Sequence, residues 1–182
     1  GKIKYISFQR QNFGPIRNDV TSFLDLATHD LSILRYLLNK KIIPKKIIKH
    51  DILRKNSGDI VFANFASGST RIDINVSWLN PEKVRKITII TDKKMILYDE
   101  MDLEKPIKIF SNYASYPKIS KYSKSYFSKK AFVYKGKSRF IKLKNKMPLH
   151  SEILSFIKND INLTNLTFAE DIIKITKKLK II

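Results

Sequence analysis

The chain has 182 residues and no cysteine, which fits a single domain and excludes a disulfide framework or a thiolate metal site. Its 36 basic and 16 acidic residues give a formal net charge of +20, so we expect the surface to attract anions. The sequence has no apolar run of the roughly 18 residues that a membrane span needs and no signal-peptide pattern at its start, so we expect a cytoplasmic protein that does not bind membranes.

The first quarter of the chain predicts one strand followed by one long helix. Residues 2–10 alternate with the period of two that is typical of a strand. Gly14-Pro15 interrupts the pattern, and apolar residues then recur at helical spacing through the stretch 23–38, FLDLATHDLSILRYLL. We expect Pro44 to end this helix, because proline cannot continue one.

Residues 45–110 return to the period of two and predict a run of mostly antiparallel strands. The segments 59–66 and 70–79 flank Gly68 as a hairpin, 85–91 and 94–100 form a second hairpin, and further strands are expected at 45–54 and 107–110. The regular alternation in 70–79 indicates that one face of the sheet is covered and the other is polar. Trp78 falls on the apolar side, where we favour a core or interface position over stacking on a sugar.

Residues 111–146 are rich in tyrosine, serine and lysine and allow two interpretations. Aromatic side chains interleaved with lysines resemble a surface that binds single-stranded nucleic acid. The interpretation that we favour is a long surface loop with edge strands at AFVY (131–134) and RFIKL (139–143). Only seven of the 36 basic residues are arginines, the better readers of bases, and isoleucine is as enriched as lysine. A general compositional bias therefore explains the charge better than nucleic-acid binding does.

The C-terminal part predicts two helices. Pro148 suits the first turn of a helix over 148–161, and a second helix follows over 168–181. The expected buried stripe of the first consists of Leu149, Ile153, Phe156 and Ile157. Helices at the ends of a block of strands indicate an α+β domain, with a large, mostly antiparallel open sheet and helices on one face. We predict that residues 1–182 form one such domain.

Two chemistry-bearing side chains lie near the start of the long helix. Asp25 and His29 are four residues apart and therefore face the same way on a helix. A carboxylate beside a histidine orients the ring and supports its protonated form, which lets the histidine take a proton from a hydroxyl group. The alternative is that Asp25 interacts with the helix dipole and His29 is an ordinary polar neighbour. Spacing alone leaves both interpretations open.

Cofactor and metal motifs are missing from the sequence, whereas three residues near the helix are candidates for substrate binding. The five glycines are too scattered for a phosphate-binding loop, and the three histidines lack metal-ligand spacing. Arg10 and Asn12 end the first strand, and Arg17 lies in the loop before the helix. A basic residue there can bind a carboxylate or a phosphate, although ordinary loop charges are the alternative.

Two stretches together point to a known family. GPIRNDVTSFLDLATHDLSILRYLL (14–38) and SGSTRIDINVSWLNPEKVRKITIITDKKMILYDEM (67–101) resemble the C-terminal domain of the Gfo/Idh/MocA oxidoreductases, and most closely the sugar-nucleotide 3-dehydrogenases. The resemblance covers residues 1 to about 110, with a looser match at PLHSEILSFI (148–157). It implies a C-terminal domain like that of glyceraldehyde-3-phosphate dehydrogenase, whose open sheet face commonly forms a homo-oligomer interface.

The resemblance also implies an activity and the partners that it needs. Family members oxidise a sugar or sugar-nucleotide hydroxyl, with His29 in the position of the proton acceptor and Asp25 in that of its orienting carboxylate. NAD or NADP would bind mainly to an N-terminal Rossmann domain, whose motifs these 182 residues do not contain. The Glu-Lys-Pro at 104–106 lies between strands and is not the family's lysine motif. We therefore expect the chain to be inactive alone. The other hypotheses are an oligomerisation or binding module and a basic nucleic-acid-binding domain.

Overall fold

The computed structural model describes residues 1–38, 40–116, 131–143, 148–158 and 166–179. Within these ranges, one sheet has the strand order β10-β7-β6-β5-β1-β4-β3-β2, and β8 and β9 form a separate small sheet. β1 and β4 are parallel, and the other neighbouring strands are antiparallel. The strands are β1 (Ile3–Phe13), β2 (Ile43–His50), β3 (Ile60–Ser67), β4 (Thr70–Ser77), β5 (Leu79–Thr91), β6 (Met95–Asp99), β7 (Ile107–Phe110), β8 (Tyr113–Ser115), β9 (Phe132–Tyr134) and β10 (Ser138–Ile141).

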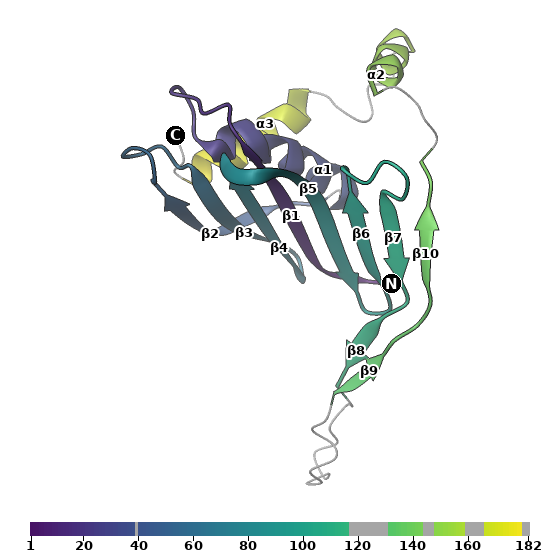
Figure 1. Ribbon diagram of the computed structural model, residues 1–182. Coiled ribbons are helices and arrows are strands. Elements are labelled where there is room, and N and C mark those ends of the chain that lie inside the picture. The colour runs from purple at the N-terminus through teal and green to yellow at the C-terminus, as the bar shows by residue number, and fades with distance from the viewer. Residues whose placement is uncertain (39, 117–130, 144–147, 159–165, 180–182) are drawn as a thin grey trace.

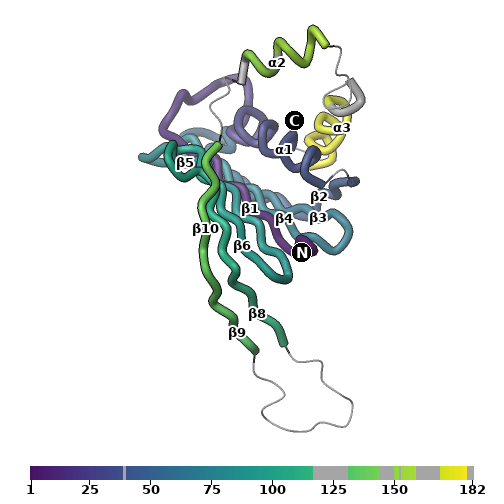
Figure 2. The backbone as a smooth tube through the Cα atoms, turned by 90° about the vertical axis from the view of Figure 1, so that its right-hand side faces the viewer, coloured from purple at the N-terminus to yellow at the C-terminus, as the bar shows by residue number. Residues whose placement is uncertain are grey.

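The helices lie on one side of the large sheet. A π-helical turn, η1 (Phe23–Ala27), runs directly into α1 (Thr28–Leu38), and the later helices are α2 (Pro148–Ile157) and α3 (Leu166–Lys178). Figures 1 and 2 show α1 and α3 side by side over the sheet, while α2 stands apart from it. None of the described helices is long and apolar enough to cross a membrane. The predicted α+β class, a mostly antiparallel open sheet, is confirmed.

The core lies between the covered face of the sheet and the helices η1, α1 and α3. Alternate residues of the central strands enter it, and Leu31 and Leu34 of α1 meet them without any solvent exposure. Burying such a side chain stabilises the fold by about 1.5–3 kcal/mol. The apolar side predicted for residues 70–79 is confirmed, because its members are all buried: Ile72, Ile74, Val76 and Trp78.

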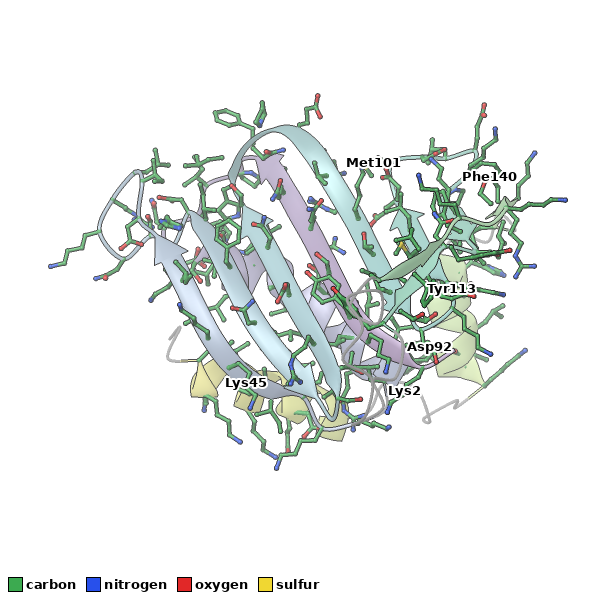
Figure 3. All side chains as sticks on the ribbon, turned by 90° about the horizontal axis from the view of Figure 1, so that it is seen from below. Lys2, Lys45, Asp92, Met101, Tyr113 and Phe140 are labelled. Atoms are coloured by element: carbon green, nitrogen blue, oxygen red, sulfur yellow. The ribbon has the colours of Figure 1, made fainter. Side chains whose placement is uncertain are left out.

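The opposite face of the sheet carries polar side chains at its centre. The Tyr5 hydroxyl donates to one Asp73 oxygen and the Asn64 amide donates to the other, each at 2.6 Å. Burial and the neighbouring Asp73 carboxylate raise the pKa of Tyr5. Figure 3 looks onto this face, which the described helices leave uncovered.

The structure corrects the predicted end of the long helix and the extent of the next strand. α1 ends at Leu38, and Pro44 lies inside β2, so the prediction that proline stops the helix is wrong. β2 is an edge strand with a register shift after Pro44, and such strands tolerate a residue that has no N–H donor. β2 also ends at His50 rather than at residue 54, because Asp59 accepts the N–H groups of Ile52 and Leu53 at 2.8 Å and closes a loop.

The predicted buried stripe of α2 is also wrong where the structure describes its side chains. Ile153, Phe156 and Ile157 are 49%, 87% and 71% exposed, and the Leu149 side chain lies outside the described residues. Helical spacing of apolar residues predicts an amphipathic helix, but it does not supply the surface that covers the stripe. In the preceding region, β9 and β10 confirm the two predicted strand pieces, and residues 117–130 lie outside the described part.

Candidate functional site

The start of η1 is held by hydrogen bonds from the preceding turn and from the loop before β3. The Thr21 hydroxyl accepts the Leu24 N–H at 3.4 Å, and the Thr21 carbonyl accepts the Asp25 N–H at 3.1 Å. Ser22 is fully buried and donates both its hydroxyl and its N–H to the carbonyl of Gly58. These contacts fix the backbone from which the Asp25 side chain projects.

The Asp25 carboxylate is held from two sides. Its Oδ2 accepts the indole N–H of Trp78 at 3.0 Å, and its Oδ1 lies 3.5 Å from an Arg17 nitrogen. Trp78 has no exposed surface, so it cannot stack on a sugar and instead positions this carboxylate. Arg17 is more strongly paired with Asp19, at 2.6 Å, and both of those side chains are exposed. Arg17 thus lies next to Asp25, as part of an exposed ion-pair group.

His29 lies in the first turn of α1 and is exposed. Among the described residues it has no hydrogen-bond partner, so the structure does not show a direct Asp25–His29 bond. The hydrogen bonds of the Asp25 carboxylate are instead with Trp78 and Arg17. The two side chains lie on the same helix start, with Asp25 fixed and His29 accessible.

Asp30, the next residue, turns inward and pairs with Arg10. The Arg10 Nε lies 2.8 Å from the Asp30 Oδ1, and the side chains are 14% and 2% exposed. Burial raises the pKa of Asp30, and Arg10 and the nearby His29 oppose that shift. The Asp30 Oδ2 is buried without a hydrogen-bond partner in the described part of the chain. Arg10, a predicted substrate-binding residue, is therefore engaged by a carboxylate beneath the site.

Asn12, another predicted substrate-binding residue, holds a third arginine in place. Its Oδ1 accepts the Arg85 Nη2 at 2.6 Å, and its amide nitrogen donates to the carbonyl of Gly14. The Arg85 Nη1 donates to the carbonyls of Gln11 and Val84 at 2.8 and 2.9 Å. The sequence interpretation did not single out Arg85. The sequence showed only that Arg85 lies at the start of a predicted strand. The pairing of that strand with the first one, which brings Arg85 opposite Arg10, is a tertiary feature.

An open pocket of 470 Å³ joins these elements. It contains Asp25 and Asn12, two of the predicted site residues, whereas Arg10, Arg17 and His29 are not part of its lining. Within the described residues, no group of three histidine or carboxylate side chains is placed to hold a metal ion. The pocket is lined by Asn12, Phe13, Gly14, Pro15, Asp25, Leu26, Pro81, Lys83 and Arg85.

Comparison with known proteins identifies the fold. No family model and no curated protein matches the sequence. The UDP-N-acetylglucosamine 3-dehydrogenase GnnA from Acidithiobacillus ferrooxidans matches with a TM-score of 0.73 and 14% identity, over 100% of this chain and 53% of GnnA. The chain has the fold of the C-terminal domain of the Gfo/Idh/MocA dehydrogenases.

Two further structures extend this likeness to the Gfo/Idh/MocA fold. The dehydrogenase MviM from Clostridium difficile matches with a TM-score of 0.64 and 12% identity, over 99% of this chain and 54% of MviM. An NAD-binding protein from Listeria innocua matches with a TM-score of 0.62 and 14% identity, over 99% of this chain and 56% of the Listeria protein. The chain thus spans about half the length of these proteins. The match extends beyond residue 110, where the sequence resemblance becomes weak, so the later strands and helices also belong to this fold.

Proposed function

We propose that this chain is the substrate-binding and catalytic half of an NAD(P)-dependent dehydrogenase that acts on a sugar or sugar-nucleotide hydroxyl. The observation that carries the proposal is a carboxylate, Asp25, fixed at the wall of a pocket, with the accessible His29 on the same helix start. GnnA is named a UDP-N-acetylglucosamine 3-dehydrogenase and the Listeria protein is named an NAD-binding protein, and both support this class of activity.

In the proposed reaction, His29 takes the proton of the substrate hydroxyl on a ring nitrogen. We assign Asp25, on the same helix start, the role of the carboxylate that accompanies this histidine. Trp78 keeps Asp25 in place by donating its indole N–H. A bound nicotinamide would supply the hydride acceptor, and we propose that a Rossmann domain outside these 182 residues holds it.

The proposed cofactor domain would cover apolar surface near the site. Phe13 ends β1 and Ile16 lies in the loop that follows, and they are 74% and 42% exposed. Ile52 and Leu53 lie in the loop after β2 and are 61% and 53% exposed. The two loops are linked, since Arg54 donates to the carbonyl of residue 17 at 2.9 Å. Exposed apolar side chains around a polar site are typical of a surface that another domain covers.

We also propose that the uncovered sheet face forms a homo-oligomer. Ile48 of the edge strand β2 and Phe62 of the neighbouring strand β3 lie on that face, are 40% and 41% exposed, and stand opposite each other in the strand register. The experiment is the oligomeric mass of Phe62→Lys measured by light scattering, with Leu103→Lys, in the loop between β6 and β7, as the control. We expect the first substitution to reduce the mass and the second to leave it unchanged. Unchanged mass in both variants would contradict this interface.

The experiment that tests the activity compares two histidine variants in the enzyme completed by its cofactor domain. His29→Asn should lower the rate of nicotinamide reduction by about 10²–10⁴-fold, the usual contribution of a general base. His150→Asn, an exposed histidine in α2, is the matched control and should keep the wild-type rate. Wild-type turnover in His29→Asn would favour the binding-module hypothesis.

A further inference from the structure

We propose that Arg85 and Lys83 form a site for an anionic group, a carboxylate or a phosphate, at the wall of the pocket that contains Asp25. Both residues line the pocket, and Asp25 lies in the same lining. The inference rests on the proposed function, because it assigns a negative charge to the substrate of that site.

Arg85 is held in a defined orientation and keeps donors for a ligand. A guanidinium group has five N–H donors. Three of the Arg85 donors bind the carbonyls of Gln11 and Val84 and the amide oxygen of Asn12, which leaves two (five minus three). An arginine fixed in this way loses little conformational freedom when an anion binds, and its planar fork suits the oxygens of a carboxylate or phosphate.

Arg85 has a positive neighbour and forms no ion pair among the described residues. Arg85 stands directly opposite Arg10 in the register of β1 and β5, so two positive groups are adjacent. The buried Asp30 pairs with Arg10 at 2.8 Å, whereas Arg85 has no ion pair among the described residues. Burial, followed by repulsion from Arg10, lowers the pKa of Arg85, and the more distant charges of Glu100, Asp30 and Asp25 oppose that shift without forming an ion pair. A neutral hydrogen-bond donor could hold the Asn12 loop without the repulsion from Arg10, so a positive side chain at this pocket wall favours a ligand of opposite sign.

Asp25 sets the direction in which an anionic substrate would lie. Its carboxylate would repel an anion, but it is already shared between the Trp78 indole and Arg17. Lys83 is exposed on the strand that carries Arg85 and adds a second positive charge to the same wall. The anionic group is therefore favoured at the Lys83 and Arg85 wall, and the reacting hydroxyl is left for Asp25 and His29.

The test is an NMR titration of the 182-residue chain with inorganic phosphate and, separately, with acetate. We expect the amide signals of Asn12, Lys83 and Arg85 to shift during the titration, and the affinity obtained from these shifts to be higher for one of the two anions. The preferred anion distinguishes a phosphate site from a carboxylate site. Arg85→Gln should weaken binding of the preferred anion about tenfold or more, since it removes a charged hydrogen-bond partner. Arg71→Gln, an exposed arginine of β4, is the control with the same charge change and should bind normally.

Two outcomes would overturn the anion site. Unchanged affinity in Arg85→Gln is one, and equal weakening in Arg71→Gln is the other, because it indicates only general attraction to a chain of net charge +20. If Arg85→Gln does not fold, Lys83→Gln replaces it, since Lys83 is exposed; a several-fold weakening supports the site and no change rejects it. The titration involves no turnover, so its failure is distinct from a failure of His29→Asn to affect catalysis.

Discussion

Replacing Asp30 should destabilise the fold strongly, because it leaves a nearly buried arginine without its carboxylate. The Arg10 side chain is only 14% exposed in the wild-type structure and faces Arg85 across the strands, so Asp30→Ala leaves its charge largely buried and next to a like charge. Removing one partner of a buried ion pair typically costs about 3–5 kcal/mol. Since Arg10 keeps some contact with solvent, we expect a loss near the lower end, about 3 kcal/mol of the free energy of unfolding.

The assay is urea unfolding followed by the fluorescence of Trp78, which is the single tryptophan of the chain and is fully buried. Linear extrapolation gives the free energy of unfolding in water. Glu170→Ala is the control, because it removes an exposed carboxylate from an ion pair with Lys174, and we expect little change.

A double substitution separates the ion pair from simple loss of packing. Arg10→Met with Asp30→Leu replaces both charges with apolar side chains, and such replacements of buried pairs are often neutral or stabilising. The double variant should therefore be more stable than Asp30→Ala. The reasoning is refuted if Asp30→Ala loses less than about 1 kcal/mol, or if the double variant is the less stable of the two.

Three further predictions concern pH, the site and a turn. Burial raises the pKa of Asp30, so the folded state holds the proton of this carboxyl group more tightly than the unfolded state does. The resulting gain in stability is complete below the ordinary carboxyl pKa of about 3.9 and is lost as the pH rises through the raised pKa. As the pH increases across this range, the free energy of unfolding of the wild type, measured with urea, should fall relative to that of Asp30→Asn; a relative increase would contradict this. Trp78→Phe removes the hydrogen-bond donor to the partly exposed Asp25 and should lower the free energy of unfolding by about 1.5 kcal/mol. Urea unfolding followed by circular dichroism measures this loss, and an unchanged unfolding midpoint would argue against that bond. Gly68 has a φ of +58° with open space around its Cβ position, so Gly68→Ala should cost about 1 kcal/mol and Gly68→Asn less; equal losses would be evidence against backbone strain.

Local sequence patterns were sufficient to predict most elements of the sheet. The hairpin around Gly68 follows from alternation on both sides of a residue with positive φ, and these neighbours interact whatever the rest of the chain does. The resemblance in the first 110 residues also led to the fold that the structural comparison shows. By contrast, Pro44 was misplaced because its tolerance depends on β2 being an edge strand, which is a property of the whole sheet.

By itself, the sequence indicated most of the strands and helices, though not all of their ends, and placed Asp25 and His29 on one helix start, because these features depend on residues close together in the chain. Tertiary structure decided what surrounds them. Trp78 reaches Asp25 only because β4 lies under η1, and Arg10 meets Arg85 only through the antiparallel register of β1 and β5. Contacts between residues distant in sequence are selected by the packing of the whole sheet, and no local periodicity encodes them.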